Sequence, residues 1–169
     1  MDLITALAVS ISVLGGIATF LFLSPVGLGL QIWAAFIAWG AFYHCGGKEA
    51  GLGKAITHLL FGAVMALIML LLATQAPLAA SLGLPLWAAI CVFITVFIVV
   101  YAAKNPMLSD IPASVFGYAP VAGLALAGKN FAVTSVSLEN PFINVALSLV
   151  IGAVFGYLSE KVAGVLVKK

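Results

Sequence analysis

Charged residues are scarce in this sequence, and arginine is absent. The 169 residues include seven lysines and five acidic residues, so only 7% are charged, while 64% are hydrophobic. A soluble domain is usually about 25% charged and about 45 to 50% apolar, and the present composition cannot cover a water-facing surface. The composition therefore excludes a soluble enzyme and a disordered chain. It leaves an all-α integral membrane protein.

The other scarcities exclude further classes of protein. A formal charge of +2 is too small and too scattered for a nucleic-acid-binding surface. The two cysteines, Cys45 and Cys91, lie in apolar stretches, where cysteine usually behaves as a small hydrophobic residue. Catalytic motifs such as a nucleophile elbow, HExxH or a phosphate-binding glycine loop are missing. We therefore expect neither enzymatic activity nor a cofactor.

Long charge-free intervals predict six membrane-spanning helices. A helix needs about 20 apolar residues to cross the bilayer core, so the intervals 3–47 and 55–103 each hold two spans. Proline and glycine punctuate the middle of each interval and separate its two helices. Two further apolar stretches complete the set. The predicted helices lie near 3–23, 30–46, 55–75, 85–103, 111–128 and 140–159.

The lysines predict the orientation of these helices. Six crossings place both termini and the loops near residues 50 and 104 on one side of the membrane, and six of the seven lysines fall on that side. Only Lys129 falls on the other side, so the positive-inside rule places both termini in the cytoplasm. The six lysines are Lys48, Lys54, Lys104, Lys161, Lys168 and Lys169.

An internal repeat is visible at a spacing of 54 residues. LGLQIWAAF at 28–36 matches LGLPLWAAI at 82–90. The match predicts one membrane domain, 1–169, built from three tandem helical hairpins at about 1–50, 51–104 and 105–169. Because each hairpin has an even number of spans, the copies would share one orientation. Chance similarity between apolar segments is the alternative.

Candidate residues for a solute pathway gather around a proline in the fifth predicted helix. Ion-coupled transport usually needs an ionisable group inside the membrane, and none lies in the middle of a predicted span. A proline frees the carbonyl four residues earlier, and broken helices are tolerated mainly where they face protein or a water-filled cavity. The candidates are Phe116, Gly117, Tyr118 and Pro120. A simple packing kink is the alternative.

The two repeated tryptophans, Trp33 and Trp87, give a second candidate element. Both lie a few residues inside the predicted outer ends of their helices, where tryptophan often serves only as an interfacial belt residue. Their repetition also permits an aromatic constriction for planar neutral molecules. Gln31 and Asn144 would then offer hydrogen bonds.

Other residues suggest packing or metal binding. Gly62, Gly152 and Gly156 are small residues of the kind that lets membrane helices approach closely, in a tight bundle or a homo-oligomer. A weaker signal is a set of soft metal ligands near the inner ends of two helices, namely His44, Cys45 and His58. Their spacing matches no known ligand motif, and the alternative is histidine reaching toward water.

Four segments resemble a bacterial inner-membrane family known as domain of unknown function 1097. They are LSPVGLGLQIWAAFIAWGAFYHCGG, GLGKAITHLLFGAVMAL, SDIPASVFGYAPVAGLALAG and SLVIGAVFGYLSEK, and together they span nearly the whole chain. The resemblance implies a small multi-pass inner-membrane protein and no particular activity. SLGLPLWAAICVF and FGYAPVAGLAL also look like segments of urea transporters, but in reversed order and with Ala88 and Ala89 near the place of a polar threonine.

Three hypotheses for function follow from these residues. The first is a passive channel or facilitator for a small neutral or weakly polar solute, with urea or amides as examples. The second is a non-transporting membrane scaffold or regulatory subunit, which predicts a filled helical bundle. The third is a metal-binding membrane protein. In each case the expected partner is the lipid bilayer, with a small-molecule solute or a second copy of the chain as further options.

Overall fold

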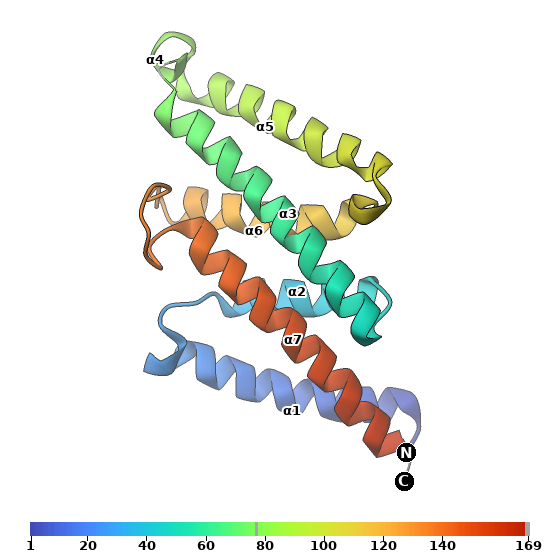
Figure 1. Cartoon of the computed structure of the whole chain (residues 1–169). Coiled ribbons are helices and arrows are strands. Elements are labelled where there is room, and N and C mark those ends of the chain that lie inside the picture. The colour runs from blue at the N-terminus through green and yellow to red at the C-terminus, as the bar shows by residue number, and fades with distance from the viewer. Residues whose placement is uncertain (77, 168–169) are drawn as a thin grey trace. The chain divides into compact units, whose positions relative to one another are not determined.

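The structure is a computed structural model that describes residues 1–76 and 78–167, and every regular element in these ranges is a helix (Figure 1). Single 3-10 turns at Pro25–Gly27, Ala102–Lys104 and Pro106–Leu108 connect some of the helices. The α-helices are α1 (Leu3–Leu23), α2 (Ile32–His44), α3 (Lys48–Gln75), α4 (Leu78–Leu82), α5 (Leu84–Tyr101), α6 (Ile111–Ala127) and α7 (Pro141–Val167).

Four helical segments are long and apolar enough to cross a membrane. They are α1, α3, Leu84–Lys104 (α5 with the turn after it) and α7. α6 is a shorter apolar helix of 17 residues, and α2 has 13 residues. At about 1.5 Å per residue, α2 is about 20 Å long and falls short of the ~30 Å hydrocarbon core. The all-α membrane protein is confirmed, whereas six spans and the cytoplasmic termini are not.

The chain forms two compact units. Unit 1 comprises Met1–Ile56 and Leu147–Lys169, and unit 2 comprises Thr57–Ala146. Unit 1 contains α1, α2, the start of α3 and most of α7, and unit 2 contains most of α3, α4, α5, α6 and the start of α7. The three hairpin units predicted from the sequence have other boundaries and stay predictions.

In unit 1, α2 packs closely on α7. The backbone N–H of Gln31, the residue before α2, donates a hydrogen bond to the Ser148 hydroxyl at 2.9 Å. One turn further on, Gly152 lies against the carbonyl group of Ala35, so closely that a Cβ atom would overlap its oxygen. Gly156 lies against the ring of Phe42. Glycine thus permits the close approach of these helices.

In unit 2, α6 packs on α3 by the same contacts. The backbone N–H of Asp110, the residue before α6, donates a hydrogen bond to His58 Nε2 at 3.0 Å. Gly62 lies against the carbonyl group of Ser114, again with no room for a Cβ atom. Gly117 of α6 lies in the same way against the carbonyl group of Leu59.

These matching contacts recur at fixed spacings in the sequence. Asp110 and Ser114 of α6 follow Gln31 and Ala35 of α2 by 79 residues, while Ser148 and Gly152 of α7 follow His58 and Gly62 of α3 by 90 residues. In these contacts the short helix α2 matches α6, and the long helix α3 matches α7. All six buried residues of α2 have buried counterparts 79 positions later: Ala34, Ala35, Ala38, Trp39, Ala41 and Phe42 correspond to Ala113, Ser114, Gly117, Tyr118, Pro120 and Val121.

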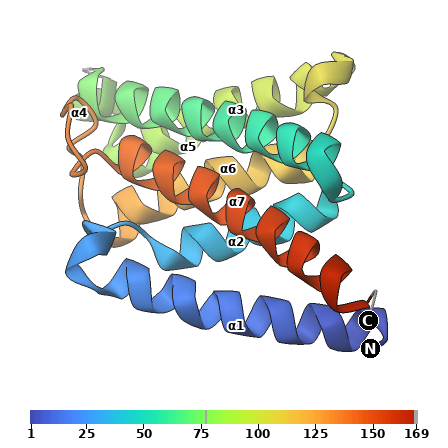
Figure 2. The ribbon, with the colours of Figure 1, turned by 60° about the horizontal axis from the view of Figure 1, so that its bottom comes forward.

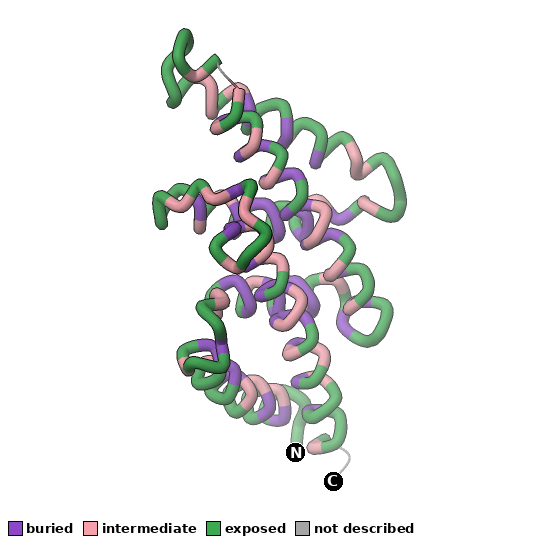
Figure 3. Tube along the Cα trace, turned by 60° about the vertical axis from the view of Figure 1, so that its left-hand side comes forward, coloured by how far each residue is buried: buried purple, intermediate pink, exposed green. Residues whose placement is uncertain are grey.

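The tandem hairpin repeat predicted at a spacing of 54 residues is not confirmed. Trp33 lies in α2 and Trp87 in α5, and these helices are not counterparts in the repeat defined by the contacts. Of the four candidate spans, the long helices have the largest share of buried residues. In the most apolar stretch of each span, 50% of the residues are buried in α3 and 44% in α7, against 28% in α1 and 17% in Leu84–Lys104. Buried and exposed positions alternate along the helices (Figure 3), as expected where one side meets protein and the other meets lipid.

Polar contacts gather at one end of unit 1. The amino group of Met1 donates to the carbonyl of Leu166 at 3.5 Å, so α1 begins where α7 ends (Figure 2). In the turn before α3, Gly46, Gly47 and Lys48 all have positive φ angles of 97°, 66° and 58°. The Lys48 N–H donates to the Glu160 carboxylate at 2.7 Å. A carboxylate from α7 therefore caps the start of α3 and fixes this turn.

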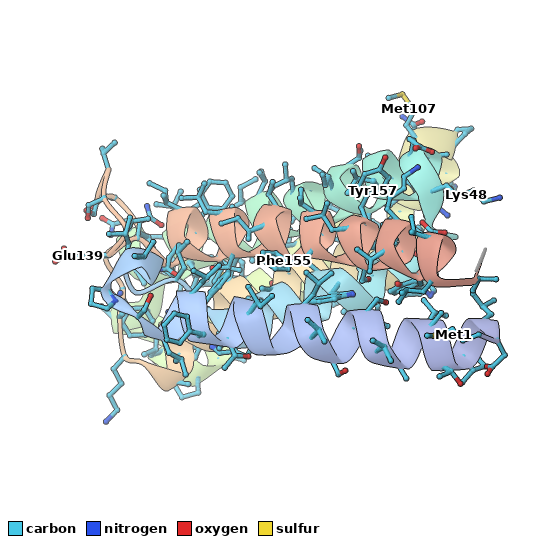
Figure 4. The ribbon with its side chains drawn as sticks, turned by 90° about the horizontal axis from the view of Figure 1, so that it is seen from below. Met1, Lys48, Met107, Glu139, Phe155 and Tyr157 are labelled. Atoms are coloured by element: carbon cyan, nitrogen blue, oxygen red, sulfur yellow. The ribbon has the colours of Figure 1, made fainter. Side chains whose placement is uncertain are left out.

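Figure 4 shows Met1 and Lys48 toward the same end of unit 1. Nearby, the Lys161 ammonium group and the Tyr157 hydroxyl both donate to the Glu49 carboxylate, at 2.7 and 2.9 Å. Within unit 1 the N-terminus, the α2–α3 turn and the last turns of α7 therefore share one end. Lys168 and Lys169 lie outside the described residues.

Candidate functional site

A buried polar cluster lies at the start of α6 in unit 2. Asp110, His58 and Ser114 are 9%, 2% and 0% exposed. One carboxylate oxygen of Asp110 accepts the N–H of Ala113 at 3.1 Å, which caps the helix, and the Ser114 hydroxyl donates to the Asp110 carbonyl at 3.1 Å. Because His58 Nε2 accepts the Asp110 N–H, this nitrogen carries no proton in the arrangement.

The start of α2 in unit 1 has the same backbone geometry and different side chains. Ser148 replaces histidine as the acceptor, and the Gln31 side chain does not cap the helix. Its amide group instead donates to the Gly29 carbonyl at 2.8 Å, and its oxygen accepts the indole N–H of Trp33 at 3.0 Å. The structure therefore brings together Gln31 and Trp33, two of the predicted pathway residues.

The second predicted tryptophan has another environment. The indole N–H of Trp87, near the start of α5, donates to the Leu72 carbonyl near the end of α3 at 2.9 Å. This bond joins two helices of unit 2. Trp33 is 39% exposed and lies in unit 1. The proposed constriction by the two tryptophans stays a prediction.

The predicted element around Pro120 divides into an exposed and a packed part. Phe116 is 37% exposed, whereas Gly117 lies on the Leu59 backbone and Pro120 is buried inside α6. The Tyr118 hydroxyl lies 2.9 Å from the Thr95 hydroxyl of α5, which also donates to the Cys91 carbonyl. Gly117, Tyr118 and Pro120 are thus packed inside unit 2.

Asn144, the last pathway candidate, helps to fix the loop before α7. Its side-chain amide donates to the Leu138 carbonyl at 3.1 Å. Asn140 acts in the same loop, where its amide donates to the carbonyls of Val133 and Ser135. Asn144 lies in unit 2 with Trp87, whereas Gln31 and Trp33 lie in unit 1.

The sequence analysis missed a buried polar chain in unit 1. The indole N–H of Trp39 donates to the Ser159 hydroxyl at 3.0 Å, and this hydroxyl lies 2.7 Å from that of Tyr43. Trp39 and Tyr43 are four residues apart on α2 and therefore share a face. In a membrane interior, the hydroxyl of a serine inside an apolar helix needs a hydrogen-bond partner from the protein. This requirement was the signal in the sequence that could have identified Ser159.

The three weak metal-ligand candidates occupy two units. His44 and Cys45 lie at the end of α2 in unit 1, and His58 lies in α3 in unit 2, where its Nε2 accepts a backbone N–H. Within residues 1–76 and 78–167, no three His, Cys, Asp or Glu side chains form a group that could hold a metal ion.

Unit 2 also contains an apolar cavity of about 550 Å³. It lies where α3 ends, α5 begins and α6 ends, with α4 beside it. The walls are formed by Met69, Leu70, Ala73, Thr74, Ala79, Ala80, Leu84, Ala88, Val92, Leu126 and Phe131. Unit 1 has a smaller cavity of about 170 Å³, bounded mainly by α1, the turn after it and α7.

One protein family, described as a protein of unknown function (DUF1097), matches residues 8–164. The chain belongs to the DUF1097 family. The match extends from the first turns of α1 to the last turns of α7, so the DUF1097 region includes all or most of each helix. The resemblance noted in the sequence is confirmed for DUF1097, and the likeness to urea transporters is not shown. Neither a curated protein nor a solved structure matches this DUF1097 chain.

Proposed function

We propose that the chain is a passive channel or facilitator for a small neutral or weakly polar solute across a bacterial inner membrane. The observation that supports this proposal most is the matching set of contacts between short and long helices, which favours a repeat of two three-helix copies, α1–α3 and α5–α7, in which the short helix of each copy packs on the long helix of the other. Repeats of this kind are common in membrane transporters, whose binding sites often use discontinuous helices. Both termini are cytoplasmic in this proposal, by the distribution of lysines.

The number of helices in each copy sets its direction through the membrane. If α1, α2 and α3 cross once each, then α5, α6 and α7 cross in the opposite directions, because three is odd. The six crossings would form an inverted pair rather than three parallel hairpins. The first copy has a broken crossing, in which non-helical residues precede the ~20 Å α2. The hydrogen bond from Gln31 to Ser148 stabilises this break at the point where α2 begins.

The polar groups within the apolar helices favour a neutral solute. Trp39, Ser159 and Tyr43 in unit 1, and Thr95 and Tyr118 in unit 2, carry uncharged hydroxyl or indole groups. The lysines and acidic residues among residues 1–76 and 78–167 lie instead near helix ends or in loops. Uncharged donors and acceptors can replace the water around an amide or alcohol, whereas a permanent ion would demand stronger compensation.

Solute flux into proteoliposomes tests the proposal. Stopped-flow light scattering would follow urea, acetamide, glycerol and water gradients for the wild type, Trp33→Ala and Trp87→Ala. We expect one solute to equilibrate at least several times faster than in empty liposomes, and at least one tryptophan variant to change that rate. Phe93→Ala is the control, since Phe93 is 71% exposed on α5. Rates equal to those of empty liposomes for every solute would defeat the proposal.

A non-transporting scaffold or regulatory subunit is the second candidate. It is favoured by the contacts of Gly117, Tyr118 and Pro120, which fill the interior of unit 2 instead of lining an open path. A scaffold predicts no flux for any solute and a stable partner in mild detergent. In both proposals the chain is not an enzyme and needs no cofactor, and a homo-oligomer stays a prediction.

A further inference from the structure

The cavity of unit 2 has walls that suit an apolar ligand. Ten of its eleven lining residues are apolar. The exception, Thr74, donates its hydroxyl hydrogen to the Leu70 carbonyl at 2.8 Å. A polar solute entering this space would lose hydrogen bonds to water without adequate replacement. The volume of about 550 Å³ is in the range of small-ligand pockets, about 300 to 1,000 Å³.

The position of the cavity suits a ligand that belongs to the bilayer. The walls come from the last turns of α3 and α6 and the first turns of α5, so the cavity lies near the ends of three apolar helices. Trp87, one residue before the lining residue Ala88, bonds to the end of α3. Tryptophan is enriched at the depth where headgroups meet acyl chains. A lipid chain could therefore enter from the interface.

The loop at this end of unit 2 carries one positive and one negative side chain. The loop 128–140 contains two charged residues, Lys129 and Glu139, and both are exposed. Lys129 lies between the lining residues Leu126 and Phe131, and its N–H donates to the Leu126 carbonyl at 3.4 Å. The Asn130 side chain donates to the Glu139 carbonyl at 2.6 Å, which brings the two ends of the loop together. Figure 4 shows Glu139 extending from this loop.

We propose that the cavity holds one acyl chain of a membrane phospholipid whose headgroup carries both a phosphate and a primary amine, as in phosphatidylethanolamine. The apolar walls receive the chain, Lys129 attracts the phosphate and Glu139 attracts the ammonium group. This arrangement uses both loop charges and requires no polar group inside the cavity. The inference is independent of the proposed transport function, because a scaffold could hold such a lipid equally well.

Native mass spectrometry of the full chain tests the proposal. The purified protein would be stripped of lipid in detergent, then mixed with equimolar phosphatidylethanolamine and phosphatidylglycerol of the same acyl chains. We expect one retained phospholipid per chain, with phosphatidylethanolamine preferred. Ala88→Phe fills the cavity and should lower retention at least fivefold. Ala89→Phe is the matched control, because Ala89 is exposed and does not line the cavity, and it should retain the lipid.

The loop charges are tested separately, with variants on the protein surface. Glu139→Gln should shift the preference toward phosphatidylglycerol by about fivefold, and Lys129→Gln should weaken retention of both lipids by about the same factor. Lys104→Gln, at the other end of α5, should change neither. Equal retention by Ala88→Phe and the wild type would overturn the cavity assignment. A lipid preference unchanged in Glu139→Gln would overturn the headgroup assignment.

Discussion

Units 1 and 2 join a short helix to a long one by the same backbone contacts and with different side chains. Gly152 of unit 1 and Gly62 of unit 2 each receive a backbone carbonyl of the short helix. The acceptor for the first N–H is the Ser148 hydroxyl in one unit and the His58 imidazole in the other. The shared part of the repeat is therefore its backbone geometry, and its polar chemistry has diverged.

The two units also differ in what lies near the ends of their long helices. In unit 1, Glu49 binds Lys161 and Tyr157, and Glu160 caps α3. In unit 2, the corresponding space near the end of α3 contains the apolar cavity. Contacts that both units share maintain the fold, so the features that only one unit has are the better candidates for function.

The largest expected effect comes from adding a methyl group at the shared glycines. Gly62→Ala and Gly152→Ala should each lower the free energy of unfolding by about 3 kcal/mol, because the new Cβ atom meets a backbone carbonyl that cannot move away alone. Equal losses in the two variants would support equivalent helix pairs. Unfolding by denaturant in detergent micelles measures both.

The controls for these variants are glycines in the same two helices. A Cβ atom at Gly53 of α3 or Gly164 of α7 meets nothing within 4 Å. Gly53→Ala and Gly164→Ala should leave stability unchanged or raise it by up to about 1 kcal/mol, because alanine favours helix. If Gly62→Ala proved as stable as Gly53→Ala, the close contact of α3 with α6 would be wrong.

Removing the two different acceptors should have the next largest effect. His58→Ala leaves the buried Asp110 N–H without this partner, and Ser148→Ala does the same to the partly buried Gln31 N–H, each at a cost of about 1 to 3 kcal/mol. His58→Ala should cost more, because it also leaves a larger void. The same unfolding measurement applies, with Ser12→Ala as control, since the Ser12 hydroxyl donates to the Val9 carbonyl of its own helix at an exposed position. If neither variant lowered the free energy of unfolding, these two hydrogen bonds would not hold the starts of α6 and α2 in place.

The sequence predicted the positions of the helices better than their lengths. The spans predicted at 3–23 and 111–128 agree with α1 and α6 to within one residue. α3 begins at Lys48 instead of near residue 55, and α7 extends to Val167 instead of ending near 159. Counting apolar residues finds the part of a helix that lies in lipid, and charged turns such as Lys48–Lys54 continue the helix into water.

The repeat was the feature hardest to predict. Leu59, Gly62, Ala63 and Val64 recur 90 positions later as Leu149, Gly152, Ala153 and Val154. In a chain so rich in these residues, a match of this kind is expected by chance. Two matched tryptophans are rarer and therefore favoured the spacing of 54 residues. The contacts between glycine and carbonyl distinguish the true counterparts. The same limit applied to Asp110, which directly precedes the span predicted at 111–128 and which the structure places in a buried cluster.

The two short helices should also differ in how much their first residue contributes. Asp110→Ala removes the carboxylate that caps α6 and should cost about 0.5 to 2 kcal/mol. Gln31→Ala should cost less, because the Gln31 side chain makes no cap to α2. It should instead change the fluorescence of Trp33, whose indole N–H it binds. A larger stability loss in Gln31→Ala than in Asp110→Ala would reverse the comparison.

The smallest expected effect concerns the starts of the helices α1 and α5. Asp2 accepts hydrogen bonds from the Thr5 hydroxyl and N–H at 2.6 and 2.9 Å, whereas Gly83 before α5 has no side chain to offer. These bonds favour the charged carboxylate and hold the pKa of Asp2 below its ordinary value of about 3.9. The stabilisation of α1 is therefore complete above that ordinary pKa and is lost as the pH falls through the lower, folded value. Carbon NMR titration of Asp2 in micelles should give a midpoint below the ordinary pKa of an aspartate, and Thr5→Val should raise it. An unchanged midpoint in Thr5→Val would mean that the hydroxyl does not set the charge of this cap.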